Sequence, residues 1–236
     1  SMQRLSSGLR VNSSKDDAAG LAIADRMNAQ IRGIAVAIRN ANDGISLAQT
    51  AEGALATVTD ALQRMRELAV QAANGSNGAG DLANLNAEYQ ELSSEVTRVA
   101  DQTKFNGKAI IGSGAGTQTF QVGANVGDTL TVTTSGITTV AGDLLSAANA
   151  NAAITALDTK LDAITTDRAK YGAAMSRFSF AVSNLQITGE NQTAARGRIM
   201  DADFAAETAN LSRAQILQQA GTAMVAQANQ QPQTVL

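Results

Sequence analysis

Residues 27–72 read MNAQIRGIAVAIRNANDGISLAQTAEGALATVTDALQRMRELAVQA, and apolar residues recur through them at alternating steps of three and four. The alternation fails only between Ile45 and Ala51, where two steps of three follow each other. This spacing is typical of a coiled-coil seam with one stammer. The seam positions are Met27, Ile31, Ile34, Ile38, Ala41, Ile45, Ala48, Ala51, Leu55, Val58, Leu62, Met65, Ala69 and Ala72.

The helix that carries this seam is predicted to begin near Ser14 and to end at Asn74-Gly75. Ser14 and Asp17 have the spacing of a capping box, and glycine is common just past a helix end. Such a helix is on the order of 90 Å long, so we predict a rod. Two shorter helices with a break near Gly44 or Gly53 are the alternative, because each glycine costs about 1 kcal/mol inside a helix.

Two more helices follow from the same spacing. Residues 75–80 are predicted to be a loop, and Asp81 the N-cap of a second helix that packs antiparallel on the first. A third long helix in the second half should fold back beside them, with Arg168 as a charge in its seam. The spaced positions are Leu82, Leu85, Tyr89, Leu92, Val96 and Val99, then Ile154, Leu157, Leu161, Ile164, Tyr171, Met175, Phe178, Val182 and Leu185.

The middle of the chain has a different pattern. A tight turn is expected at Asn106-Gly107. Beyond it, Phe120 and Val122 alternate with polar residues, as do Leu130 and Val132. A period of two favours strands, so residues 119–134 are predicted to form a β-hairpin. The fold class is therefore mainly α, an elongated rod of long antiparallel coiled-coil-like helices with a small β-hairpin region in the middle.

Composition excludes much of enzymology. The 236 residues contain no Cys and no His, which removes zinc sites, cysteine nucleophiles and catalytic triads. The net charge is -3, and no basic patch suits nucleic acid. No run of apolar residues in the sequence approaches the roughly 20 that a membrane-spanning helix needs. The pair Asp16-Asp17 and the glycine-rich stretches 75–80 and 112–116 are better explained as a helix start and loops. We predict no catalytic, cofactor or metal site.

Two surfaces are candidates for binding partners. One lies beside the seam within LQRMRELAVQ, residues 62–71, where the aliphatic Leu68 stands among charges and amides. Its residues are Gln63, Arg64, Glu67, Leu68 and Gln71, with Glu88 of the second helix expected at its border. The other is an apolar stripe near the C-terminus with no obvious partner inside the chain. Its residues are Leu211, Ile216, Leu217, Ala220, Met224 and Val225.

Three long stretches together resemble bacterial flagellin. They are QRLSSGLRVNSSKDDAAGLAIADRM with RNANDGISLAQTAEGAL, then LQRMRELAVQAAN with RVADQTKFNG, and finally NLSRAQILQQAGTAMVAQANQQPQTVL. The resemblance implies a secreted structural subunit, located outside the cell in the bacterial flagellum, that polymerises into the filament used for motility. It further implies other flagellin subunits and a flagellar export chaperone as partners, both contacting the C-terminal stripe, and no enzyme activity, cofactor, nucleic acid or membrane.

The resemblance also implies a division along the chain. Residues 1–107 correspond to the N-terminal helical half of the rod domain, and 108–143 to a short central hairpin region in place of variable outer domains. Residues 144–200 correspond to the C-terminal helical half, and 201–236 to an amphipathic helix of the filament-core domain. Family segments before QRLSSGLR and after Leu236 are absent from this sequence. We therefore expect this chain to be monomeric and elongated.

The motif LQRMRELAVQ resembles the segment by which the family is recognised by the host's flagellin-sensing Toll-like receptor. This resemblance assigns receptor recognition to the first of the two surfaces, with Leu68 as an exposed aliphatic contact. Two other functions stay open at this point, a hook-filament junction protein and a cell-surface flagellin homologue that binds polysaccharide. The scarcity of aromatic residues, 3% of the chain, argues against sugar binding.

Overall fold

A computed structural model describes residues 2–113, 115–133 and 136–230 of the chain. The chain forms two compact units, one made of Ser1–Gly33 with Ile187–Leu236 and the other of Ile34–Gln186. Helix α2 (Ala18–Ala72) and helix α4 (Ala147–Met200) each contribute residues to both units. These two compact units do not test the predicted division into four consecutive segments, which stays a prediction.

The first unit combines both ends of the chain. It holds α1 (Met2–Ser7), the beginning of α2, the end of α4 and α5 (Phe204–Gln230). The segment after α1 runs antiparallel to the α4–α5 junction, where Arg10 N–H donates to the Met200 carbonyl over 2.6 Å and Ala202 N–H donates to the Gly8 carbonyl over 3.0 Å. Val11, Ala24 and Met200 bury a small core here.

Helix starts differ from the predictions by a few residues. Helix α2 begins at Ala18, and the Asp17 carboxylate caps it by accepting from Gly20 N–H over 2.8 Å, so the predicted start near Ser14 is wrong. Helix α3 (Ala79–Gln102) begins before Asp81, whose carboxylate accepts from Gly78 N–H over 3.0 Å. Asp81 therefore holds the third helical position and not the N-cap, and its charge still lies at the favourable helix end.

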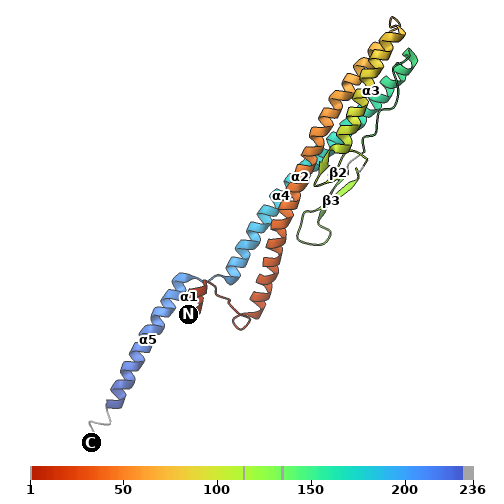
Figure 1. The fold of residues 1–236 in the computed structure, drawn as a ribbon. Helices are drawn as coiled ribbons and strands as arrows, with labels where there is room; N and C mark the ends of the chain where they lie inside the picture. The colour runs from red at the N-terminus through yellow and green to blue at the C-terminus, as the bar shows by residue number, and fades with distance from the viewer. Residues whose placement is uncertain (1, 114, 134–135, 231–236) are drawn as a thin grey trace. The chain divides into compact units, whose positions relative to one another are not determined.

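Three helices make the second unit. Helices α2, α3 and α4 run side by side within it (Figure 1) and enclose one continuous apolar core. From Ala41 to Ala72 every predicted seam position is buried except Ile45, which is half-buried. The mainly helical fold is confirmed. No membrane-spanning candidate occurs among the helices of the described ranges.

Helix α2 continues through both glycines, so the two-helix alternative is wrong. Gly44 is buried against the ring of Phe178 on α4, and a Cβ at this position would lie 2.6 Å from Phe178 Cζ. Glycine is thus required here for close helix packing. Gly53 is exposed, with no atom within 4 Å of the corresponding point. Packing along the whole helix outweighs the intrinsic cost of these two glycines.

Two small hairpins occupy the middle of the chain, where the sequence predicted one hairpin and a tight turn before it. Strands β1 (Lys104–Phe105) and β2 (Lys108–Ala109) join through the expected Asn106-Gly107 turn, in which both residues have positive φ. Strands β3 (Thr117–Gln121) and β4 (Thr129–Thr133) pair with Phe120 opposite Leu130. The predicted residue 134 lies outside the described residues.

A ring contact and a hydrogen bond join the second hairpin to the helices, in addition to the packing of its apolar residues against the main core. Phe120 meets Phe178 edge to face at 5.4 Å between ring centres, and Asn40 Nδ2 donates to the Gln121 carbonyl over 3.0 Å. Phe178 of α4 therefore lies between Gly44 of α2 and the ring of Phe120 on β3. This contact places the hairpin against the helices.

Candidate functional site

The predicted recognition face is built around Arg64. Its guanidinium donates to Glu67 on the same helix over 3.0 Å and to Glu88 on α3 over 2.9 Å. The structure thus brings Glu88 into the face, at the border where the sequence placed it. These three side chains are about half or more exposed. The result is a charged cluster that links two helices and stays open to solvent.

The two carboxylates act on the protonation of the arginine. The hydrogen bonds that the guanidinium donates to Glu67 first, and then to Glu88, raise the pKa of Arg64 above its ordinary value. The guanidinium therefore stays charged at any physiological pH. A partner that displaces either carboxylate must supply its own acceptor, because a desolvated guanidinium without one is costly.

Leu68 does not belong to the exposed face. Its side chain is only 1% exposed and packs in the core of the second unit, so the interpretation of Leu68 as a surface contact is wrong. The physical reason is that α2 packs against two helices at once. Leu68 continues a second series of three-four steps through Val58, Ala61, Met65 and Ala72, and this series is also buried or half-buried.

The exposed aliphatic residue of this region is Val70, at 51% exposure. It lies in a shallow groove with Gln63, Arg66, Glu67 and Gln71. Sequence reasoning missed it. The sequence did contain a signal for an exposed apolar residue, because Val70 is apolar and belongs to neither of the two buried series. Four of the predicted residues, Gln63, Arg64, Glu67 and Gln71, do lie exposed on one side of α2.

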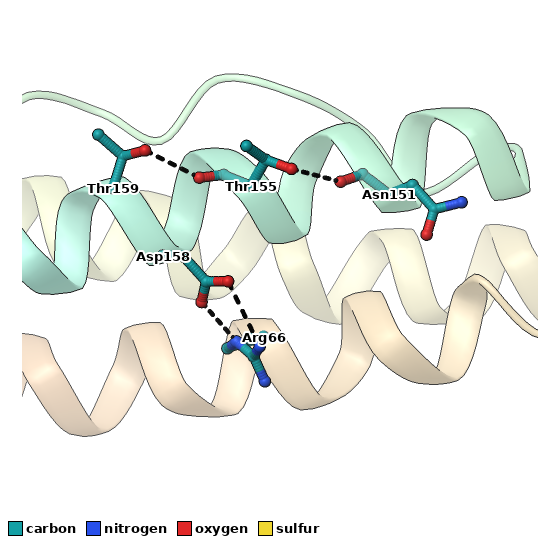
Figure 2. Close-up of polar contacts among 5 residues, drawn as sticks. All are labelled: Arg66, Asn151, Thr155, Asp158 and Thr159. Atoms are coloured by element: carbon teal, nitrogen blue, oxygen red, sulfur yellow. Dashed lines mark hydrogen bonds and ion pairs between the residues drawn. The ribbon is translucent and has the colours of Figure 1, made fainter.

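Arg66, which also lines this groove, forms an ion pair with α4. Its Nε donates to Asp158 Oδ1 over 2.6 Å, and its Nη2 reaches Oδ2 at 3.4 Å (Figure 2). The arginine hydrogen bond lowers the pKa of Asp158. Thr155 and Thr159, drawn nearby, instead donate to carbonyls of their own helix. The ion pair is therefore the polar link between helices in this view.

A similar pair accounts for the charge in the seam of α4. Arg168 donates through Nε to Glu52 of α2 over 2.8 Å, and both side chains are partly buried. This hydrogen bond raises the pKa of Arg168. The cation therefore enters the helix interface paired with a carboxylate of the neighbouring helix.

The second predicted surface lies on α5 in the first unit. Asp203 caps this helix by accepting from Ala205 N–H over 2.9 Å. Ile216, Leu217, Ala220, Met224 and Val225 are exposed, with Ile216 at 64% and Met224 at 73%, whereas Leu211 is half-buried. As predicted, most of these apolar side chains have no cover within the described residues.

These residues do not form a single stripe. An α-helix turns by about 100° per residue, which places Ile216, Ala220 and Met224 on one side of α5 and Leu211 with Val225 on nearly the opposite side. The expectation of one apolar face is therefore wrong. A helix that is apolar on opposite sides needs neighbours on both of them to leave water.

The described part of the chain offers no cluster of three or more His, Cys, Asp or Glu residues suited to a metal ion. The two candidate surfaces differ in kind, since one is charged and held on packed helices while the other is apolar and uncovered.

Family models match both halves of the chain. The model for the bacterial flagellin N-terminal helical region matches residues 1–119, and the one for the C-terminal helical region matches residues 154–236. Flagellin from Halalkalibacterium halodurans is 49% identical over 242 aligned positions, which cover all of this chain and 89% of that protein. Flagellin from Bacillus subtilis is 39% identical, with coverage of 100% and 90%.

A solved structure agrees with these matches. The crystal structure of Bacillus cereus flagellin superposes with a TM-score of 0.58 at 34% identity, over 62% of this chain and 88% of that one. A putative flagellar hook-associated protein from Vibrio parahaemolyticus shares only the fold, at a TM-score of 0.51 and 16% identity. From these matches at both ends and along its whole length, the chain belongs to the bacterial flagellin family.

Proposed function

We propose that this chain, a structural subunit of the flagellar filament by family, is secreted and polymerises with copies of itself to drive swimming. The observation that carries the proposal is the uncovered α5, which is apolar on opposite sides. One neighbour could cover only one side of it. A polymer surrounds each helix with several copies, which suits such a helix better than a single groove does.

The test is filament assembly in a bacterium that lacks its own flagellin and expresses this chain with a flagellin N-terminal segment restored before QRLSSGLR. Electron microscopy counts filaments, and a soft-agar assay measures swimming. Replacing Ile216 and Met224 together by Ser should abolish filaments, whereas replacing the exposed Gln218 by Ser on the same helix should preserve them. Normal filaments from the double variant would contradict the role given to α5.

An export chaperone would cover α5 before assembly. Support comes from the same exposed side chains, because an apolar helix needs cover in the cytoplasm to avoid aggregation. A chain ending at Asp201 should lose the complex with the flagellar export chaperone, as measured by calorimetry. Chaperone binding that survives this truncation would place the contact elsewhere.

Recognition by the flagellin-sensing Toll-like receptor is the second candidate function. It is supported by the exposed cluster of Arg64, Glu67 and Glu88 on rigid, packed helices, with Gln63, Gln71 and the corrected aliphatic contact Val70 beside it. Little conformational entropy would be lost on binding such a face. Leu68 would act only by holding α2 in the core.

Surface plasmon resonance against the receptor ectodomain tests this assignment. Arg64→Ala should weaken binding about tenfold or more. Arg98→Ala is the matched control, because Arg98 is equally exposed and paired with Glu95 of α3. Its variant should bind like the parent. Equal binding by both variants would show that this face is ordinary solvated surface.

The alternatives named from the sequence have less support. The curated relatives quoted above are flagellins, whereas the hook-associated structure shares the fold alone. Neither fact favours polysaccharide binding. A glycan-binding screen that gave a specific ligand would revive that alternative.

A further inference from the structure

The chain contains three Asn-Gly pairs, at Asn74, Asn77 and Asn106. In such a pair the backbone nitrogen of the glycine can attack the asparagine side-chain carbonyl carbon, because glycine has no side chain to obstruct the approach. The reaction requires a free backbone N–H, an unrestrained carboxamide and a backbone able to rotate. All three pairs lie in connections between helices or strands of the second unit. They differ in how firmly the reacting groups are held.

Asn77 is held at both reacting groups. Its Nδ2 donates to the Gln71 carbonyl over 2.6 Å, so the carboxamide is fixed at the end of α2. The N–H of Gly78, which would have to attack, donates instead to the Asp81 carboxylate over 3.0 Å. Ring closure at Asn77 must break both hydrogen bonds and uncap α3.

Asn106 is held by its backbone. It has φ +48°, Gly107 has φ +78°, and the two form the turn between Phe105 and Lys108, which are paired across β1 and β2. Closing a five-membered ring rotates the Asn106 backbone out of this left-handed turn. That rotation opens the strand pair, and Phe105 packs against the main core.

Asn74 is held more weakly than Asn77 and Asn106, by long hydrogen bonds only. It is exposed just past the end of α2, and its Oδ1 accepts from Ser76 N–H over 3.3 Å, which polarises the carbonyl. Its Nδ2 makes no hydrogen bond to another described residue. The Gly75 N–H has no hydrogen-bond partner among the described residues, and no atom lies within 4 Å of a Cβ built on Gly75. Within the described residues the Asn74 backbone makes two hydrogen bonds that oppose rotation: its N–H donates to the Gln71 carbonyl over 3.2 Å, and its carbonyl accepts from Asn77 N–H over 3.3 Å.

We propose that Asn74 is a site of spontaneous deamidation in the folded protein, reacting ahead of Asn77 and Asn106. The Gly75 nitrogen forms a bond to Cγ of Asn74 and gives up its proton to solvent. The Cγ–Nδ2 bond breaks, and the nitrogen leaves as ammonia after taking up a proton. Water then opens the cyclic imide at either carbonyl, which leaves aspartate or the β-linked isoaspartate, with no oxidant or reductant involved.

The product changes the connection between α2 and α3. It adds one negative charge to a chain of net charge -3, and the β-linked form inserts a methylene group into the backbone directly after the recognition face at Gln71. The inference depends only on the local contacts of this turn and not on filament assembly or receptor binding.

Peptide mass spectrometry tests the order of reaction. The purified full-length chain is incubated folded in mildly alkaline buffer, and in parallel in concentrated urea, then digested. Fragment ions separate Asn74 from Asn77 by the exchange of NH for O. In the folded chain Asn74 should react several-fold faster than either other site, whereas in urea the three rates should become similar.

Two variants make the test specific. Gly75→Ala should slow the reaction at Asn74 several-fold without disturbing the fold, since the added methyl group meets no atom within 4 Å. Asp81→Asn, which weakens the hold on Gly78 N–H, should speed the reaction at Asn77. The inference is overturned if Asn77 or Asn106 reacts as fast as Asn74 in the folded chain, or if Asn74 reacts only in urea.

Discussion

Gly44→Ala and Gly53→Ala make the same chemical change on the same helix. We expect them to change the free energy of unfolding in opposite directions. Each substitution removes a glycine from α2, which by itself favours the helix by about 1 kcal/mol. Gly53 is exposed, and its new methyl group would meet no atom within 4 Å. We expect Gly53→Ala to stabilise the second unit by about 0.5–1 kcal/mol.

At Gly44 the methyl group meets the Phe178 ring. The Cβ would lie 2.6 Å from Cζ and 2.9 Å from both Cε atoms, whereas carbon atoms in contact prefer about 3.5–4.0 Å. The ring must retreat by roughly 1 Å, against its edge-to-face contact with Phe120. Overpacking of this kind costs about 1–3 kcal/mol, so the helix gain is cancelled or exceeded and Gly44→Ala should be destabilising by up to about 2 kcal/mol.

Urea unfolding followed by tyrosine fluorescence measures both effects in the second unit alone. The chain has no Trp and two Tyr, and both Tyr89 and Tyr171 are buried in that unit. A change of 1 kcal/mol moves the urea midpoint by roughly 0.3–1 M. In a Phe178→Ala background, Gly44→Ala should become stabilising like Gly53→Ala. Equal stabilisation by both glycine variants in the parent chain would refute the Gly44–Phe178 packing.

The remaining predictions use the same unfolding assay. Leu62→Ala should cost about 2–5 kcal/mol, since Leu62 is 1% exposed in the core, and a loss below about 0.5 kcal/mol would contradict its burial. Arg66→Ala and Asp158→Ala should each lower the urea midpoint less than Leu62→Ala does, because both side chains of the pair are close to half exposed. The double variant should lose no more than the sum, because both changes remove the same ion pair. The Arg66 hydrogen bond lowers the pKa of Asp158 below its ordinary 3.8, so its contribution is complete above pH 3.8 and is lost as the pH falls through the lower folded value. The stability difference between the parent and Asp158→Asn should accordingly shrink only below that pH, and a difference that vanishes near neutral pH would contradict the pairing.

Local patterns were enough to predict most of the fold. The three-four spacing follows from the 3.6-residue helical turn and predicted the seam from Ala41 to Ala72, and a period of two predicted β3 and β4. These signals are strong because only a helix brings a long series of apolar residues spaced by three and four onto one side, where they can be buried together. Helix starts were less certain, since Asp17 and Asp81 can each cap from more than one position.

The candidate surfaces were predicted in part. The charged residues Arg64, Glu67 and Glu88 do gather, because their spacing along one helix and across to the next is local information. Val70 was missed and Leu68 misassigned, because the exposure of a residue at the edge of a seam depends on how many helices pack around it. Most of the apolar residues predicted on α5 are exposed, although they do not share one side of the helix, and their role in binding stays a prediction.

The sequence by itself therefore determined which segments become helices and strands, which family the chain resembles, and which chemistry it lacks. The sequence also predicted two helical partners for the first long helix, but only the tertiary structure decided which of its side chains face them, which buries Leu68 and sets Gly44 against Phe178. It also decided the long-range pairs Arg66–Asp158 and Arg168–Glu52. The physical reason is that backbone periodicity is a property of neighbouring residues, whereas burial and ion pairing depend on side chains that the fold brings together from distant positions.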